Sequence, residues 1–217
     1  MKVLVIGATG GTGRATVEEL TSRGHEVTAF VRRPEALEAP GSRVRLIKGD
    51  VSNRAAVGAA VQGQDAVVVA LGITENALLV RLRGSRKTPL DVRSVGTRNV
   101  VEAMREHRVR RLVVQSSYGV GETRDRLSLA WKLMFSLILK PQIADTEVQE
   151  RVVRGEDLDW VLVRPVGLTD GPVGQVFESK AGETRSMKVS RAAVARFMAK
   201  AVEGSDNVGH AVALSEH

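Results

Sequence analysis

The chain has 217 residues, of which 43% are hydrophobic and 3% aromatic, and its formal net charge is +7. This length and composition exclude a disordered chain and suit a parallel sheet buried between helix layers. The absence of cysteine excludes disulfides and thiol catalysis, and we expect a cytoplasmic protein. The basic residues are scattered and match no recognition motif, so we expect no nucleic-acid partner. No apolar run reaches transmembrane length, and we expect neither a membrane span nor a signal peptide.

Strands and helices alternate along the first third of the chain. Short apolar runs rich in β-branched residues predict buried strands, and longer amphipathic stretches between them predict helices. We expect, in order, a strand at Lys2–Ile6, a helix at Gly11–Arg23, strands at Glu26–Val31 and Val44–Lys48, a helix at Asn53–Val61 and a strand at Asp65–Ala70.

The same alternation continues to the end of the chain. The expected elements are a helix at Val92–His107, a strand at Arg111–Gln115, a helix at Gln142–Arg154, a strand at Trp160–Arg164, a helix at Val189–Val202 and a strand at His210–Leu214. Strands joined by helical crossovers predict an α/β fold with a doubly wound parallel sheet of the Rossmann type, in a single domain over residues 1–217.

Two segments, 119–140 and 167–188, interrupt this alternation. Both follow the carboxyl ends of predicted strands, where open α/β sheets bind their ligands. We therefore expect them to form small lids over a ligand site. The second segment contains short apolar stretches at Val176–Phe177 and Met187–Val189, which we expect to pair as a hairpin.

A glycine-rich turn follows the first strand and opens the first helix. Glycines spaced by three residues in this position are typical of a dinucleotide-binding turn, in which the backbone approaches a pyrophosphate at a helix N-terminus. The threonines of the turn add hydroxyl donors. The predicted pyrophosphate-binding residues are Gly7, Thr9, Gly10, Gly11, Thr12 and Gly13. The four histidines are scattered without metal-ligand spacing, so we expect no metal site.

The end of the second predicted strand indicates which nicotinamide cofactor is bound. NAD-binding proteins place Asp or Glu there to accept the ribose hydroxyls. This chain has Arg32 and Arg33 instead, and guanidinium groups suit a 2′-phosphate in charge and geometry. The pattern favours NADP(H) over NAD, although two solvated surface arginines would give the same sequence.

Further motifs resemble the atypical short-chain dehydrogenase/reductases, in particular the NAD(P)H-binding group that includes biliverdin reductase B, a flavin reductase, and the NmrA-like proteins. The resemblance covers almost the whole chain. Beside the glycine turn and Phe-Val-Arg-Arg, it rests on Gly49-Asp50-Val51, Ala70-Leu71-Gly72, Gly96-Thr97-Arg98-Asn99, Ser116-Ser117 and Val163-Arg164-Pro165.

This resemblance implies a role for residues at several strand ends. Asp50 and Val51 would contact the adenine, and Leu71 and Gly72 would line the path of the adenosine. Ser116 and Ser117 would flank the nicotinamide, and Pro165 and Val166 would meet its carboxamide side. Simpler roles stay open, since Asp50 also suits a turn cap and Arg164-Pro165 also suits a strand terminator.

The Tyr-x-x-x-Lys pair of typical short-chain dehydrogenases is missing. Tyr118 is the only tyrosine, and Glu122 stands where the lysine would be. Without that proton relay, we expect an acceptor that needs little acid catalysis. Ser117 and Tyr118 are the candidate catalytic residues, with a purely structural role as the alternative. Glu147 and Glu150 lie one helical turn apart, and we expect a solvated helix face rather than a cleft-facing pair.

Residues 127–139 form an apolar segment interrupted by a polar residue at every fourth position. Three interpretations stay open: a buried helix beneath the lid, an apolar wall of the substrate pocket, or an interfacial or dimer surface. The sequence does not decide between a monomer and a dimer.

Two functions follow from these patterns. The first is an NADPH-dependent oxidoreductase that transfers hydride to a small conjugated acceptor such as a flavin, a quinone or an enone. The alternative is a non-catalytic NADP(H)-binding redox sensor that acts through a protein partner.

Overall fold

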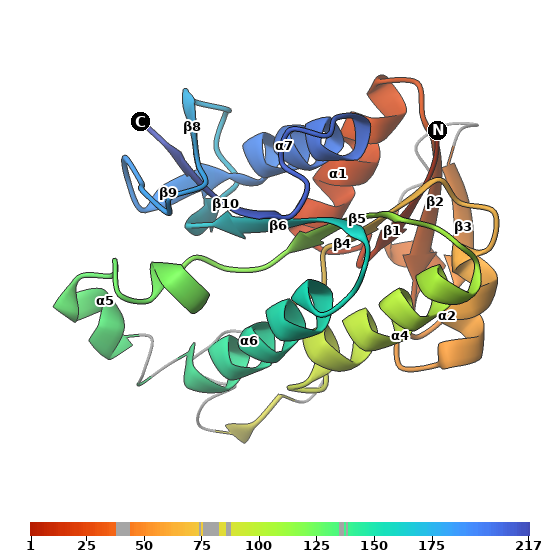
Figure 1. The fold of residues 1–217 in the computed structure, drawn as a ribbon, viewed down its shortest axis with the longest axis horizontal. Coiled ribbons are helices and arrows are strands. Elements are labelled where there is room, and N and C mark those ends of the chain that lie inside the picture. The colour runs from red at the N-terminus through yellow and green to blue at the C-terminus, as the bar shows by residue number, and fades with distance from the viewer. Residues whose placement is uncertain (38–43, 74, 76–82, 86–87, 135–136, 138) are drawn as a thin grey trace.

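A central sheet of eight strands organises the chain (Figure 1). The computed structural model describes residues 1–37, 44–73, 75, 83–85, 88–134, 137 and 139–217. The strand order is β3-β2-β1-β4-β5-β6-β10-β8, and only β8 runs antiparallel to its neighbour. The strands are β1 (Lys2–Ile6), β2 (Glu26–Val31), β3 (Val44–Lys48), β4 (Ala66–Val69), β5 (Arg111–Gln115), β6 (Asp159–Pro165), β8 (Val176–Ser179) and β10 (His210–Glu216). The predicted doubly wound Rossmann sheet is therefore confirmed.

The apolar runs form strands because both faces of the sheet are covered. In β1, Val3 and Val5 belong to one core cluster, whereas Leu4 and Ile6 belong to the cluster on the opposite face. All four side chains are fully buried. Continuous apolar runs are what such two-sided burial requires of a parallel strand.

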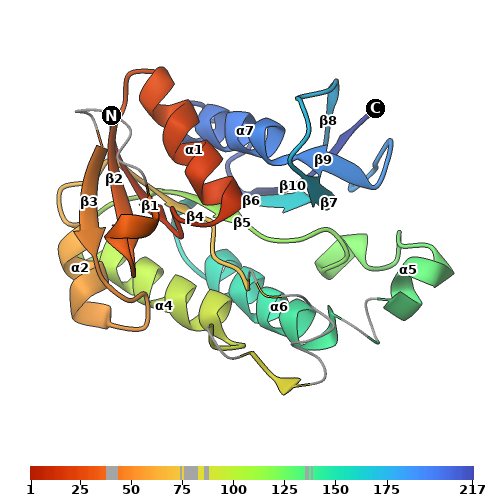
Figure 2. The ribbon, with the colours of Figure 1, turned by 180° about the vertical axis from the view of Figure 1, so that it is seen from behind.

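Two helix layers cover the sheet. Figures 1 and 2 show α1 (Gly11–Ser22) and α7 (Arg191–Glu203) side by side on one face. The other face carries α2 (Arg54–Val61), α4 (Val92–Glu106) and α6 (Lys140–Arg154). The short helices η1 (Pro34–Ala36), η2 (Gly121–Thr123) and α5 (Leu129–Met134) lie in connections. The structure contains each helix predicted from the sequence, and no end differs from its predicted position by more than two residues.

The segment after β6 differs from the predicted hairpin. Two three-residue strands, β7 (Gly167–Thr169) and β9 (Lys188–Ser190), pair in parallel as a separate small sheet. β8 does not pair with β9 but adds antiparallel to the edge of β10. The hairpin prediction was wrong because β10 extends to Glu216 and offers an open edge whose backbone groups need partners.

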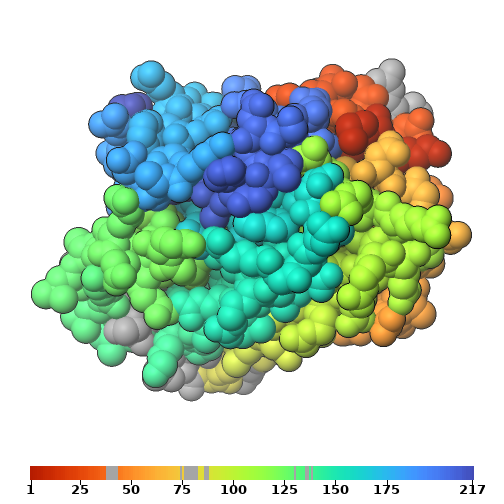
Figure 3. All heavy atoms as spheres, in the orientation of Figure 1, coloured from red at the N-terminus to blue at the C-terminus, as the bar shows by residue number. Residues whose placement is uncertain are grey.

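The apolar segment 127–139 is only partly packed. Trp131 packs against the core, but Leu129 is 83% exposed and Leu133 and Leu137 are each 59% exposed. The described part of the structure does not include residues 135, 136 and 138 or the side chain of Ala130. The first of the three interpretations, a buried helix beneath the lid, is wrong for these three leucines. In Figure 3 this green segment covers one end of the molecule, beside the blue segment that carries β8 and β9.

Within the described residues, no helix is both long and apolar enough to cross a membrane.

Candidate dinucleotide-binding site

A cavity of about 620 Å³ opens at the carboxyl ends of the central strands. Its walls include the glycine turn after β1, the end of β2, the residues after β3 and β4, and the start of α4. The volume falls in the usual range for small-molecule and cofactor sites. Eleven of the predicted cofactor residues line it: Gly7, Thr9, Gly10, Gly11, Thr12, Arg32, Arg33, Asp50, Val51, Leu71 and Gly72.

The glycine turn has the shape that its spacing predicts. Gly7 has φ +85°, and a methyl group there would stand 2.5 Å from the Ala70 carbonyl oxygen. Gly13 does not line the cavity, but a methyl group at Gly13 would overlap the Gly7 carbonyl oxygen. Gly7 therefore lets the turn pass β4, and Gly13 lets α1 pack on the turn.

The N-terminus of α1 is open to an anion. Gly10 is the capping residue and supplies no side chain to cap the helix, and no acidic residue lies in its first turn. The first N–H groups of a helix and its dipole favour phosphate. Thr9 and Thr12 line the same wall.

Arginines line the cavity at the end of β2. Arg32 and Arg33 follow that strand, and both are exposed on the cavity wall. Arg32 donates to the Thr88 hydroxyl at 3.3 Å, which brings the segment before α4 close to this end. Arg14 of α1 also lines the cavity and donates to the Ala36 carbonyl at 2.9 Å.

Asp50 lines the same cavity as these arginines. It accepts hydrogen bonds from the Ser52 N–H at 2.9 Å and the Ser52 hydroxyl at 2.7 Å. These bonds lower the pKa of Asp50, and the charge of Arg32 lowers it further against the opposing effect of partial burial. Asp50 is therefore both a turn cap and a wall of the cavity.

The start of α4 packs against the part of the cavity wall that Val51 and Leu71 form. A methyl group at Gly96 would stand 2.7 Å from Leu71 Cδ1 and 2.8 Å from Val51 Cγ2, so only glycine allows this packing. Asn99 donates to the Val51 carbonyl at 2.8 Å. The Gly96–Asn99 motif therefore holds the cavity wall in place, although Gly96 is its only member among the described lining residues.

Arg93 lines the cavity and has one buried guanidinium nitrogen, Nη1, without a hydrogen-bond partner among the described residues. Burial lowers the pKa of Arg93, and the nearby Asp145 opposes this effect. Asp145 itself accepts from the N–H groups of Arg93 and Ser94 at the start of α4. A buried guanidinium nitrogen without a partner fits a site that receives an anionic ligand.

The predicted residues at the ends of β5 and β6 are not part of the cavity wall. Ser116, Ser117, Tyr118, Pro165 and Val166 do not line it. Ser117 donates to the Tyr118 carbonyl at 3.0 Å, and the buried Tyr118 hydroxyl donates to the Gly182 carbonyl at 3.0 Å. Pro165 and Val166 are buried and make backbone bonds to Tyr118 and Leu214. At this end the cavity is bordered by Gln115 and Leu168.

Sequence reasoning missed several residues of the cavity wall. They are Arg14, Thr88, Arg93, Gln115, Leu168 and Arg191. Gln115 ends a predicted strand, and that position is the one signal that could have marked it as a candidate. Arg93 and Arg191 lie at helix starts far from the glycine turn in sequence, so no local motif identifies them.

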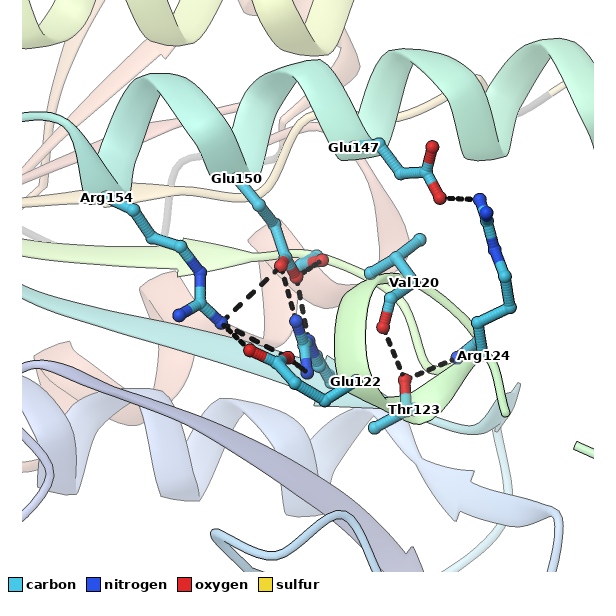
Figure 4. Close-up of polar contacts among 10 residues, drawn as sticks. Val120, Glu122, Thr123, Arg124, Glu147, Glu150 and Arg154 are labelled. Carbon is cyan, nitrogen blue, oxygen red and sulfur yellow. Dashed lines mark hydrogen bonds and ion pairs between the residues drawn. The ribbon is translucent and has the colours of Figure 1, made fainter. Parts of the chain in front are cut away.

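Ser116 and Glu150 belong to a buried ion-pair network (Figure 4). Glu150 Oε1 accepts from the Ser116 hydroxyl at 2.5 Å and from Arg164 Nε at 2.8 Å, and Glu150 Oε2 accepts from Arg164 Nη2 at 2.5 Å. Glu150 is 4% exposed and Arg164 is 3% exposed. The prediction of a solvated face was wrong for Glu150, because the buried Arg164 near the end of β6 requires a carboxylate partner.

The network continues to the protein surface. Glu122 accepts from Arg164 Nη1 at 2.6 Å and pairs with Arg154 at 3.1 Å. Partial burial alone would raise the pKa of Glu122, but hydrogen bonds and the two arginines outweigh it and lower this pKa. Burial alone would lower the pKa of Arg164, and the two glutamates outweigh it and raise that pKa. Glu147 pairs separately with Arg124 (Figure 4).

The glycine turn, the cationic wall and the sheet define a dinucleotide-binding protein of the Rossmann class. Residues 7–205 match a protein family described as NAD(P)H-binding. The chain is 31% identical over 225 residues to an uncharacterized chloroplastic protein of Arabidopsis thaliana, and this match covers 99% of the chain and 78% of the plant protein. The chain therefore belongs to the NAD(P)H-binding family, as its motifs predicted.

Two further proteins resemble the chain, one in part of its sequence and one in its fold. It is 38% identical over 122 residues to a 2-alkyl-3-oxoalkanoate reductase of Stenotrophomonas maltophilia, a match that covers 55% of the chain and 34% of that reductase. A short-chain dehydrogenase/reductase of Veillonella parvula, solved in complex with NADP, has the same fold with a TM-score of 0.77 and 18% identity. That superposition covers 99% of this chain and 94% of the other.

Proposed function

We propose that the protein is an NADPH-dependent reductase that passes hydride to a small conjugated acceptor, such as a flavin, a quinone or an enone. The observation that carries this proposal is the cavity that joins the glycine turn to Arg32 and Arg33. No carboxylate ends β2, so the arginine side chains replace the acidic group that binds ribose hydroxyls in NAD proteins. We place the protein in the cytoplasm, although its plant relative is chloroplastic.

The bound nicotinamide supplies the hydride in such a reaction. The chain's own groups position it: the turn at Gly10 and Gly11 holds the pyrophosphate, and Arg32 and Arg33 hold the 2′-phosphate. Gln115 and Leu168 border the nicotinamide end. We propose Ser117, which is half-buried and follows Gln115 by two residues, as a polar group of the acceptor site.

Tyr118 is the weaker of the two catalytic candidates. Its buried hydroxyl already donates its proton to the Gly182 carbonyl. A proton donor must instead reach the reacting atom. The proton for the reduced acceptor then comes from water, which suits an acceptor whose reduced form is a stabilised anion.

The test is steady-state oxidation of NADPH with a panel of flavins, quinones and enones. We expect turnover with at least one class of acceptor. Tyr118→Phe should retain kcat/KM within about threefold, because it removes only a hydrogen bond to a carbonyl, worth about 1 kcal/mol of folding free energy. A loss of about a hundredfold or more in kcat/KM of a folded Tyr118→Phe variant would instead indicate that Tyr118 is the general acid. Absence of turnover with every acceptor would refute the reductase.

A non-catalytic redox sensor is the second candidate. The exposed Leu129, Leu133 and Leu137 favour it, since apolar patches often mark partner surfaces. A sensor must bind the oxidised and reduced cofactors with different affinity. Equal affinity for NADP and NADPH, together with turnover on an acceptor, would exclude it.

A further inference from the structure

Arg191 approaches the glycine turn from the far end of the chain. It is the first residue of α7 and follows β9 directly. A methyl group at Gly11 would stand 2.6 Å from Arg191 Cδ and 2.7 Å from its Nε. Gly11 begins α1, and both residues line the cavity. The Arg191 side chain therefore lies against the helix end where a pyrophosphate would bind.

The backbone that carries Arg191 is firmly held. The Ser190 hydroxyl caps α7 by accepting from the Ala193 N–H, and it donates to Glu216 Oε1 at 2.8 Å. Glu216 Oε2 accepts from the Ser190 N–H at 3.0 Å. Both side chains are buried. The guanidinium group thus extends from a fixed point beside the turn.

The guanidinium group itself pairs with a carboxylate on the surface. Its Nη1 lies 2.7 Å from Asp170 Oδ1, and the Asp170 side chain is 86% exposed. Asp170 follows β7, which is the parallel partner of β9. The ion pair therefore joins the ends of the two strands of the small sheet. Exposed pairs of this kind bind weakly, so a better anion replaces the carboxylate readily.

We propose that Arg191 is a ligand of the cofactor pyrophosphate and that it exchanges Asp170 for this anion when the dinucleotide binds. The inference rests on the proposed function and deepens it. The exchange releases Asp170 and the residues after β7 from α7. Dinucleotide binding is thereby linked to segment 167–188, which also supplies Leu168 to the nicotinamide end.

The test is calorimetric titration with two ligands that share the adenosine 2′-phosphate. NADP carries the pyrophosphate, and 2′-AMP lacks it. Arg191→Gln should weaken NADP binding by about 10- to 100-fold, the effect of a lost charge-assisted hydrogen bond, and leave 2′-AMP within about twofold. Asp170→Asn should tighten NADP binding by about two- to fivefold, because it removes an exposed competitor. Arg191→Lys should fall between wild type and Arg191→Gln.

Arg196→Gln is the matched control, since Arg196 lies on the same helix and is exposed outside the cavity. It should change neither affinity. Melting temperatures and circular dichroism identify any variant that is not folded, and Asp170→Asn then tests the exchange with Arg191 intact. The inference is overturned if Arg191→Gln binds NADP as wild type does, if it weakens 2′-AMP equally, or if Asp170→Asn weakens NADP binding. If wild type binds neither ligand, the proposed function itself fails.

Discussion

Glu150 and Arg164 form a charged pair in the interior of the protein, and this pair determines where Ser116 points. The Ser116 hydroxyl donates into Glu150 rather than toward the cavity. Arg164 also contacts the turn at Gly121, where φ is +51° and a methyl group would overlap Arg164 Nη2. The pair thus fixes the connection after β5 to α6 and β6.

Replacement of Glu150 should remove the buried carboxylate partner of Arg164 and leave this buried charge to the exposed Glu122. We expect Glu150→Gln to lower the free energy of unfolding by about 3–5 kcal/mol, measured by urea denaturation. Glu147→Gln, on the same helix but in a partly exposed pair with Arg124, should cost about 0–1 kcal/mol. Equal and small losses in both variants would contradict this account of the network.

The sequence could have indicated this pair through Arg164 rather than through Glu150. Helical spacing places Glu147 and Glu150 near each other on α6 but does not distinguish a solvated face from a buried one. Arg164, in contrast, follows the apolar run Val161–Val163 of a predicted strand. A charge at such a position needs a buried partner. Which carboxylate pairs with Arg164 depends on how α6 packs against β6, and no local sequence pattern shows this packing.

At the scale of elements, long apolar runs were predictable and short strands were not. β1, β4 and β5 read directly as strands, since burial on both faces leaves few sequences possible. β7 and β9 have three residues each, and they form strands because they pair with each other. The extension of β10 to Glu216 and the edge position of β8 are likewise outcomes of pairing rather than of composition.

Replacing a glycine with alanine should have opposite effects on stability in α1 and in α2. Gly13→Ala places a methyl group on the Gly7 carbonyl, and we expect a loss of about 1–3 kcal/mol or more in stability. NADPH binding should weaken as well, because the turn must shift. Gly58→Ala in α2 meets only His107 Nε2 at 4.0 Å and should stabilise the protein by about 0.5–1 kcal/mol. Thermal unfolding and calorimetry measure both variants, and a neutral Gly13→Ala would contradict the packing role.

At the scale of the whole molecule, the fold gathers a cationic site from distant parts of the chain. Arg14, Arg32, Arg33, Arg93 and Arg191 line one cavity, and the carboxylates on its wall are Asp50 and Asp91. Sequence motifs located the two arginines that directly follow a strand. Arg14 reaches the cavity from α1, and Arg93 and Arg191 reach it because α4 and α7 begin at the same edge of the sheet. The net charge is +7, and its basic residues are scattered along the sequence. The fold therefore brings several of them together at one site that suits an anion.

The most direct test of the central claim is calorimetric binding of NADPH and NADH to wild type and to the Arg32→Ala/Arg33→Ala variant. We predict that wild type binds NADPH at least about tenfold more tightly than NADH. The variant should lose about 10- to 100-fold in NADPH affinity and change less than about threefold toward NADH. Equal wild-type affinity for the two cofactors, or an unchanged NADPH affinity in the folded variant, would contradict the assignment of this cavity to NADPH.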